Sequence, residues 1–241
     1  HDPLRRQRQM CIRDRIGGGA AGFFAAISVK ENHPSHHVTL FEKTSKVLSK
    51  VRISGGGRCN VTHDCSDIPT LCEAYPRGGK KLKSIFYQFS KSDTVDWFES
   101  RGVPLKTEKD GRMFPKSNNS QSIIDCLESE IARLRVTLKL GQTIERIDED
   151  GIGWKLNFKD QPIQKFDMVI VATGGSPKIT GFDWLKNLGH NIIPPVPSLF
   201  TFNMPNEPIK KLMGLVVENA RVMIKKSKIK TQGPLLITHW G

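Results

Sequence analysis

The sequence predicts an α/β fold built on a mostly parallel sheet, with a smaller β-rich part after it. Three observations predict it. A glycine-rich turn at 17–22 is followed by a helical segment and a strand, helical periodicity runs over 80–134, and the apolar run Met168–Ala172 leads into another glycine turn. Unbroken apolar runs are typical of parallel strands buried on both faces. The glycine turns are therefore expected at the carboxyl edge of the sheet, where open α/β sheets bind ligands.

Composition and charge narrow the function classes. The chain has 241 residues, 37% hydrophobic and 25% charged, which is typical of a globular protein. Its apolar runs reach only about five residues, so no membrane-spanning helix is expected. Lys and Arg number 37 against 24 Asp and Glu, a net charge of +13, which keeps a nucleic-acid partner open as an alternative.

Cysteine spacing indicates neither a metal site nor a disulfide framework. The five cysteines form no CxxC pair and their number is odd: Cys11, Cys59, Cys65, Cys72 and Cys126. We expect no bound metal, and a reduced, cytoplasmic setting.

The first fifteen residues do not suit the strand that should precede the glycine turn. They carry five Arg and two Asp, and Arg13-Asp14-Arg15 interrupts the few apolar positions near it. Residues 1–15 are therefore expected to be a non-native or disordered leader, with the first domain beginning at residue 16.

The turn at 17–22 has the spacing GxGxxG. Gly17 allows a tight strand-to-helix turn, Gly19 lets the backbone approach a diphosphate, and Gly22 lets the helix pack closely on the sheet. The helix expected at 20–32 leads to a strand that ends at Glu42, 20 residues after Gly22, where a carboxylate can accept hydrogen bonds from ribose hydroxyls. The pattern predicts a dinucleotide-binding Rossmann domain that takes FAD or NAD rather than NADP. The alternative is an ordinary βαβ turn with a surface glutamate.

A second glycine-rich segment, SGGGRCNVT at 54–62, follows Arg52. Three consecutive glycines let the backbone crowd a planar ligand or a phosphate, and Arg52 and Arg58 supply cationic donors. The alternative is a flexible surface loop.

These motifs resemble those of the BaiN-type (YhiN-like) flavoproteins, a family of NAD(P)/FAD-dependent oxidoreductases. The resemblance covers residue 16 to the end, and SGGGRCN is its most specific segment. Weaker matches are Phe41-Glu42-Lys43, GRMFP at 111–115, ATGG at 172–175 and GPLLITH at 233–239. The family continues for roughly half as much chain again, so the resemblance also implies that this chain is a fragment.

The resemblance implies bound FAD, with the second loop along the isoalloxazine and pyrophosphate. The residues expected at the cofactor are Gly17, Gly19, Ala20, Ala21, Gly22, Glu42, Lys43, Arg52, Ser54, Gly57, Arg58, Cys59, Asn60, Thr173, Gly174 and Gly175. NAD(P)H is the expected reductant.

The rest of the chain sets the domain boundaries. The FAD-binding domain is expected at 16–194, with a helical insertion at about 80–134. Inside that insertion, 111–117 is either a flavin-side or substrate-side loop or an ordinary helix connection. Strands are expected from Val136 to Phe158. The prolines at 194–197 mark the boundary of a truncated β-rich domain, 195–241, with strands expected at 199–202 and 215–224.

The predicted function is hydride transfer between NAD(P)H or a substrate and an acceptor through the flavin. The substrate is a small molecule of unspecified kind, and no acid or base can be assigned. Cys59 is expected to pack beside the flavin rather than to act as a redox thiol.

The rival function is an RNA-directed flavoenzyme or a basic nucleic-acid-binding module. Lysines cluster at 80–83 and 225–230, but no aromatic residues interleave with them in a known RNA-binding pattern. The sequence therefore favours a solvated surface over a nucleic-acid partner.

Overall fold

The computed structural model of the chain describes residues 12–176, 178–196 and 201–241, which divide into two compact units after Ile192. The division falls two residues before the boundary expected from the proline-rich segment.

A four-stranded parallel sheet forms the centre of the first unit, in the order β10-β1-β2-β6. Its strands are β1 (Ile12–Ile16), β2 (His37–Phe41), β6 (Thr137–Lys139) and β10 (Met168–Val171). The last strand, β10, lies beside the first, β1. All four carboxyl ends therefore meet at one edge of the sheet.

Strand β1 differs from the sequence-based expectation. Residues 12–15 were expected to belong to the leader, yet Ile12–Ile16 pairs with β2 on one side and β10 on the other. Parallel pairing uses backbone N–H and C=O groups, which every residue except proline supplies whatever its side chain. Residues 1–11 of the expected leader lie outside the described residues.

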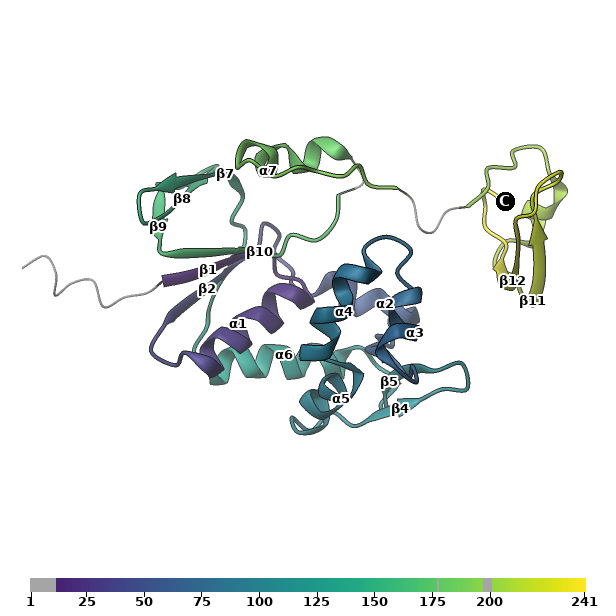
Figure 1. Ribbon diagram of the computed structural model, residues 1–241, viewed down its shortest axis with the longest axis horizontal. Helices are drawn as coiled ribbons and strands as arrows, with labels where there is room; N and C mark the ends of the chain where they lie inside the picture. The colour runs from purple at the N-terminus through teal and green to yellow at the C-terminus, as the bar shows by residue number, and fades with distance from the viewer. Residues whose placement is uncertain (1–11, 177, 197–200) are drawn as a thin grey trace, which may run out of the picture. The chain divides into compact units, whose positions relative to one another are not determined.

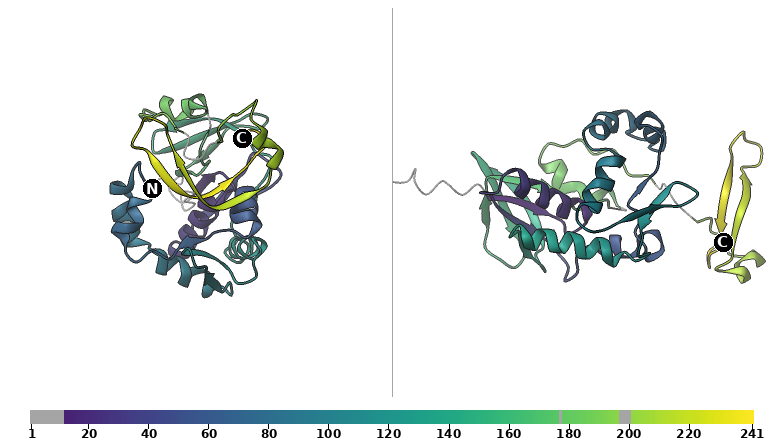
Figure 2. Two further views of the ribbon diagram at one scale, coloured as in Figure 1. Left: turned by 90° about the vertical axis from the view of Figure 1, so that its right-hand side faces the viewer. Right: turned by 90° about the horizontal axis from the view of Figure 1, so that it is seen from below.

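Two helices cover one face of the sheet. α1 (Ala20–Asn32) and α6 (Gln121–Arg133) lie side by side there (Figures 1 and 2). Phe23 and Ile27 of α1 and Ile124 and Leu127 of α6 are buried in one core. Their spacing of three or four residues places them on one side of each helix.

An antiparallel sheet covers the other face. Its strands, in the order β7-β8-β9, are β7 (Ile144–Asp150), β8 (Gly153–Phe158) and β9 (Gln164–Phe166). Phe41 of β2 packs with Leu156 and Phe158 of β8 in a second core. The region expected to form strands after Val136 does so.

The region between the first βαβ unit and α6 contains a small sheet as well as helices. It begins before the helical insertion expected at about 80–134, and α6, at the end of that range, belongs to the main sheet's helical layer. The helices that follow the second glycine segment are α3 (Ile68–Glu73), α4 (Gly79–Gln88) and α5 (Lys91–Glu99), and the small sheet has the order β3-β5-β4: β3 (Thr62–His63), β4 (Leu105–Thr107) and β5 (Arg112–Pro115). Neither expectation for 111–117 included a strand, but Arg112–Pro115 is the central strand of this sheet. Phe114, fully buried, supplies the apolar side chain that the strand packs inward.

The second unit consists of a short 3-10 helix, η3 (Pro208–Leu212), and an antiparallel hairpin of β11 (Val216–Met223) and β12 (Lys230–Leu236). The strand expected at 215–224 is present. Of the one expected at 199–202, residues 199–200 lie outside the described residues, and Thr201 and Phe202 are not in a strand.

Candidate functional site

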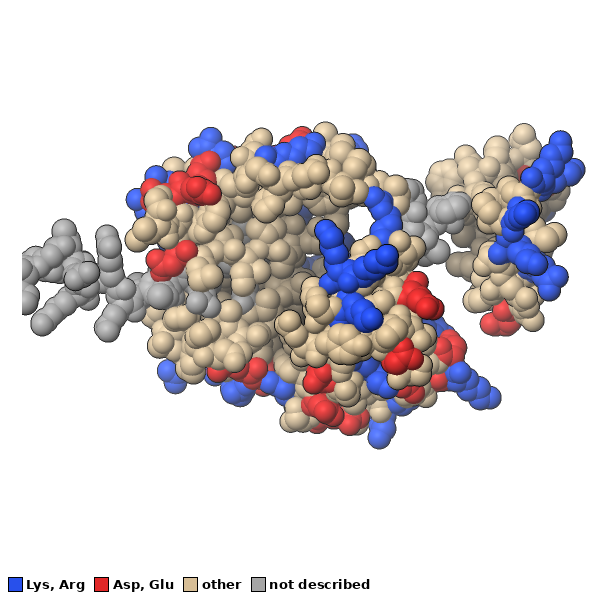
Figure 3. Space-filling model, viewed as in Figure 1, with Lys and Arg blue, Asp and Glu red and all other residues tan. Residues whose placement is uncertain are grey.

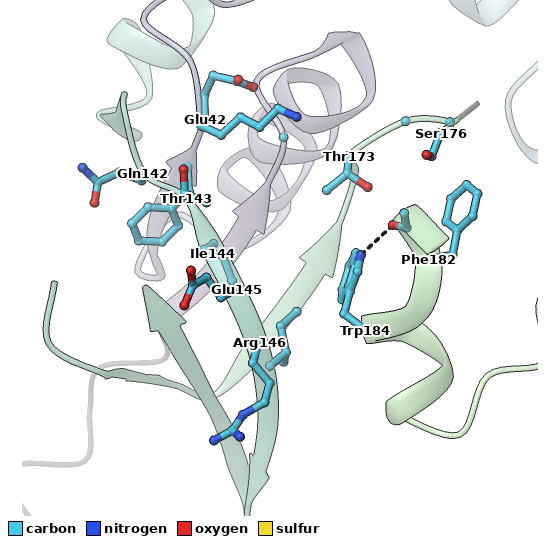
Figure 4. A pocket seen from close by; sticks show the side chains of 17 residues that line it. Glu42, Gln142, Thr143, Ile144, Glu145, Arg146, Thr173, Ser176, Phe182 and Trp184 are labelled. Atoms are coloured by element: carbon cyan, nitrogen blue, oxygen red, sulfur yellow. Dashed lines mark hydrogen bonds between the residues drawn. The ribbon is translucent and has the colours of Figure 1, made fainter. Parts of the chain in front are cut away.

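A pocket of about 360 Å³ lies at the carboxyl edge of the parallel sheet (Figure 4). This volume is within the range of small-molecule sites. Three of the turns predicted from sequence meet there, at Gly17 after β1, at Glu42 and Lys43 after β2, and at Thr173–Gly175 after β10. β1 lies between β10 and β2, so the strands that the chain forms after β1 are added on opposite sides of it. Open α/β sheets bind ligands at such a point, beyond the carboxyl ends of the strands.

The geometry of the first glycine turn assigns each glycine a separate task. Gly17 has φ +118, and a Cβ there would lie 2.4 Å from the carbonyl oxygen of Ala172. A Cβ on Gly22 would lie 2.0 Å from the carbonyl oxygen of Gly17. Among the described residues, no atom would lie within 4 Å of a Cβ on Gly19. Gly17 and Gly22 therefore permit the packing, and Gly19 leaves open space for a ligand.

The amino end of α1 begins beside that open space. Gly19 is its N-cap, no side chain caps the helix, and no acidic residue lies in its first turn. The first N–H groups of a helix lack partners within the helix and carry partial positive charge. Gly19, Ala20 and Ala21 thus offer backbone donors to an anionic group.

Glu42 ties the end of β2 to the first glycine turn. One carboxylate oxygen accepts a hydrogen bond from the backbone N–H of Gly18 at 2.8 Å. The other accepts from the N–H of Thr44 at 2.8 Å and from its hydroxyl at 2.9 Å. The carboxylate is thereby held at the wall of the pocket.

The rest of the pocket lining consists of residues that sequence reasoning missed. They come from the start of the antiparallel sheet and from the segment after β10: Gln142, Thr143, Ile144, Glu145, Arg146, Ile147, Ser176, Gly181, Phe182 and Trp184. The indole N–H of Trp184 donates to the carbonyl oxygen of Gly181 at 3.1 Å, which holds the ring at the pocket (Figure 4). The available signal was the position in the chain, since Gln142 and Thr143 lie three and four residues after the end of the parallel strand β6.

The second glycine loop, residues 54–60, lies at the end of α2 (Ser49–Gly57), where Ser54, Gly55 and Gly56 leave helical geometry. Gly55, Gly56, Gly57 and Cys59 all have positive φ. The loop is connected to the first turn through α2, because the N–H of Leu48 donates to the carbonyl oxygen of Gly18 at 2.8 Å.

The structure separates the predicted residues into two groups. Those at the pocket or at the adjoining start of α1 are Gly17, Gly19, Ala20, Ala21, Gly22, Glu42, Lys43, Thr173, Gly174 and Gly175. Those of the second loop and its approach do not line the pocket: Arg52, Ser54, Gly57, Arg58, Cys59 and Asn60.

Two cations predicted for the cofactor are engaged by other parts of the protein. Arg52 donates to the side-chain oxygen of Gln121 at 2.6 Å. Arg58 pairs with Glu108 at 2.5 Å. Lys50 was missed by sequence reasoning, although it precedes the second loop by only four residues. Its Nζ lies 3.7 Å from the position of a Cβ on Gly174, and it forms no ion pair in the part of the chain that the structure describes.

Burial raises the pKa of the Cys59 thiol, against a smaller opposing effect of a hydrogen bond with Ser54. A raised pKa disfavours the thiolate, which is the reactive form. This supports packing rather than redox chemistry for Cys59. Among the described residues, no group of three His, Cys, Asp or Glu side chains could hold a metal ion, and no helix is long and apolar enough to cross a membrane.

Sequence comparison finds similar proteins. The family described as HI0933-like protein Rossmann domain matches residues 15–239. The chain is 26% identical over 234 residues to the 3-dehydro-bile acid delta(4,6)-reductase of Clostridium scindens, covering 94% of this chain and 56% of that protein. It is 27% identical over 237 residues to the ribosomal RNA dihydrouridine synthase of Escherichia coli, again covering 94% and 56%. The chain thus spans about half the length of these relatives.

Structural comparison supports the fold. The quinol fumarate reductase FrdA of E. coli aligns with a TM-score of 0.53 and 16% identity, over 69% of this chain and 33% of that one. The 3-ketosteroid-delta4-(5alpha)-dehydrogenase of Rhodococcus jostii aligns with a TM-score of 0.51 and 14% identity, over 69% and 46%. The α/β Rossmann-type prediction and the family resemblance are both confirmed.

Proposed function

Because the chain belongs to the HI0933-like Rossmann family, we propose that its first unit binds FAD and that the protein is a flavin-dependent oxidoreductase. One observation carries the proposal. The three turns at the carboxyl edge enclose a single pocket, with Glu42 held at its wall and open space above Gly19.

The pocket suits the adenosine part of FAD. Glu42 accepts hydrogen bonds from the ribose hydroxyls, exchanging some of its present backbone partners for them. The aromatic rings of Phe182 and Trp184, together with Ile144, offer apolar surface for the adenine. These side chains add an apolar part of the pocket lining that the glycine motifs do not supply.

The diphosphate is assigned to the start of α1 and to Lys50. Unpaired N–H groups and the positive end of the helix dipole favour an anion there. Lys50, beside Gly174, adds a full positive charge. The second glycine loop is assigned to the isoalloxazine, because no atom lies within 4 Å of a Cβ placed on Gly56 or Gly57.

When bound, FAD supplies hydride transfer between a substrate and a nicotinamide, and the protein binds and orients the reacting groups. In this proposal the reductant is NADH or NADPH. The substrate is a small molecule, and one relative is named as a reductase of a bile acid. The free cysteines of the described residues fit a reducing cytoplasm.

A second candidate function is the reduction of a base in RNA, and α4 is the observation that favours it. Lys80, Lys81 and Lys83 are exposed on this helix, and Figure 3 shows Lys and Arg side chains gathered over it. Tyr87 is also exposed, at 65%. Lys80, Lys83 and Tyr87 recur at helical spacing and so share one side of α4. Cations beside an exposed ring are suited to a nucleic-acid strand, and another relative is named for ribosomal RNA.

Substitutions at Gly19 test the proposed cofactor without threatening the fold. Asp and Asn are both good N-caps, and a Cβ at this position meets no atom of the described residues within 4 Å, so both variants are expected to keep the stability of the chain. Gly19→Asp places a negative charge at the diphosphate and should weaken FAD binding at least about tenfold more than Gly19→Asn. Quenching of FAD fluorescence on titration with protein measures the affinity. Equal affinities for the two variants would contradict the placement.

Anaerobic reduction separates the two candidate functions from a binding module. Addition of NADH or NADPH to the FAD-loaded protein should bleach the visible flavin absorption. For the RNA-directed function, Lys80→Gln with Lys83→Gln should weaken RNA binding and reduce its salt dependence. The matched control removes two exposed charges outside both lysine clusters, with Lys109→Gln and Lys159→Gln. A protein that retains no flavin when reconstituted would contradict both candidate functions.

A further inference from the structure

The second glycine loop has one supported face and one open face. A Cβ on Gly55 would lie 2.8 Å from a ring carbon of Phe114 and 2.8 Å from the backbone nitrogen of Asn60. A Cβ on Gly56 or Gly57 would meet no atom within 4 Å in the part of the chain that the structure describes. The loop therefore rests on the fully buried ring of Phe114 and presents Gly56 and Gly57 outward.

Arg58 connects the loop to the sheet beneath it. Its guanidinium carbon lies 3.9 Å from the centre of the Phe114 ring. One terminal nitrogen lies 2.5 Å from a carboxylate oxygen of Glu108, and Nε donates to the carbonyl oxygen of Gly55 at 3.4 Å. A single side chain thus joins the loop backbone, the ring and a carboxylate 50 residues along the chain.

Glu108 is itself fixed by the turn between β4 and β5. Its backbone N–H donates to the carbonyl oxygen of Arg112 at 2.8 Å, which closes the hairpin. Arg112 approaches the Glu108 carboxylate only to 3.8 Å and pairs instead with Asp110 at 2.7 Å. Arg58 is therefore the principal partner of Glu108.

We propose that Glu108 is a positioning residue for the cofactor: through Arg58 and Phe114 it holds the loop so that Gly56 and Gly57 face the isoalloxazine. This inference rests on the proposed FAD function. Consecutive glycines lose more conformational freedom on ordering than other residues, so the open face is kept in one shape only if side chains outside the loop restrain it. In this assignment Arg58 acts through the loop and does not contact the diphosphate.

The assignment distinguishes two parts of the site. ADP reaches the pocket and the start of α1 but not the second loop. FAD reaches both. Loss of the Glu108 carboxylate should therefore weaken FAD binding and leave ADP binding unchanged, whereas a general loss of structure weakens both.

The experiment compares Glu108→Gln with Asp110→Asn, a matched control on the same hairpin whose side chain does not contact the loop. FAD and ADP affinities are measured by fluorescence and calorimetric titration. Cleavage by trypsin after Arg58 is followed by mass spectrometry without any ligand. For Glu108→Gln we expect about fivefold weaker FAD binding and about fivefold faster cleavage, as suits a half-exposed ion pair. Asp110→Asn should change neither.

The FAD and ADP titrations on Arg58→Gln, alone and combined with Glu108→Gln, test the connection between the two residues. The double variant should lose no more FAD affinity than either single variant, because both remove one interaction. Additive losses, or equal losses of FAD and ADP affinity, would overturn the proposal. So would unchanged cleavage in Glu108→Gln. A wild-type chain that binds no FAD contradicts the proposed function instead, and the ligand-free cleavage still tests the restraint on the loop.

Discussion

The two glycine segments of the first unit reach defined shapes by different means. In the first, Gly17 and Gly22 are required because a Cβ at either position would overlap backbone atoms nearby. In the second, Gly56 and Gly57 meet nothing, and the loop is restrained by Phe114, Glu108 and the start of α6. The first shape is imposed by close backbone contacts, one within the turn and one with Ala172, which follows β10. The second depends on side chains 50 or more residues away.

Removing the ring beneath the second loop should have the largest effect. Phe114→Ala removes a fully buried aromatic side chain and should lower the free energy of unfolding by about 3–5 kcal/mol. Urea denaturation measures this loss. Phe114→Leu retains most of the apolar volume and serves as the comparison, with an expected loss below about 1.5 kcal/mol. If both variants unfold at the wild-type midpoint, Phe114 does not support the loop.

Adding one methyl group at Gly22, in the variant Gly22→Ala, tests whether the first turn requires glycine. Gly22→Ala would place Cβ 2.0 Å from the carbonyl oxygen of Gly17, so the helix must shift from the sheet. The expected loss is about 1–3 kcal/mol in the same denaturation experiment. Gly233→Ala, where no atom lies within 4 Å, is the control. Wild-type stability in Gly22→Ala would show that the turn adapts, and would remove the contrast between the segments.

Ser120 is a smaller restraint on the second loop. Its hydroxyl donates to the carbonyl oxygen of Arg52 at 2.8 Å, its N–H donates to that of Gly57 at 2.8 Å, and its side chain is buried. Ser120→Ala removes only the first of these bonds and should cost about 1 kcal/mol. Ser122→Ala, at a more accessible position on the same helix, provides the matched control. Trypsin cleavage after Arg58 should rise in Ser120→Ala alone.

The ion pairs of Glu130 offer a comparison with the two glycine segments, because they are formed by side chains alone. Glu130 pairs with Arg133 at 2.6 Å and Arg101 at 3.1 Å, and these hydrogen bonds, Arg133 first, hold its pKa below the usual value against the opposing effect of burial. A lowered folded-state pKa stabilises the fold above the unfolded value of about 4.3, and this contribution is lost as pH falls through the folded value.

Glu130→Gln should therefore destabilise the chain at neutral pH by less than about 1 kcal/mol, and the difference from wild type should shrink in acid. Denaturation midpoints measured across that pH range test the sign. A difference that grows as pH falls would contradict it.

The sequence predicted the first turn in detail because the signals that identify it are local. Glycine spacing, a following helix and an acid after the next strand all lie within 26 residues of one another. The second loop was recognised as a motif, but Arg58 was assigned to the cofactor because nothing near it in sequence indicates Glu108 or Phe114. The wall of Phe182 and Trp184 was missed for the same reason, since it depends on how the segment after β10 folds back to the pocket.

Strand β1 shows a different limit. The pattern of side chains argued against a strand at 12–15. The structure nevertheless has a strand there, because its backbone pairs with β2 on one side and β10 on the other. Patterns of apolar residues report burial, so they underestimate strands whose position is determined by the partners on both sides.

The place of β10 in the sheet sets an order of events during synthesis. β1 pairs first with β2, which follows it within 25 residues, but its other edge waits for Met168–Val171. At ribosomal rates of about 5–20 residues per second, the interval is on the order of ten seconds. Until then the nascent chain carries an unpaired edge on its central strand and lacks one of the three turns of the pocket. The cofactor can therefore stabilise this unit only after most of it has been made.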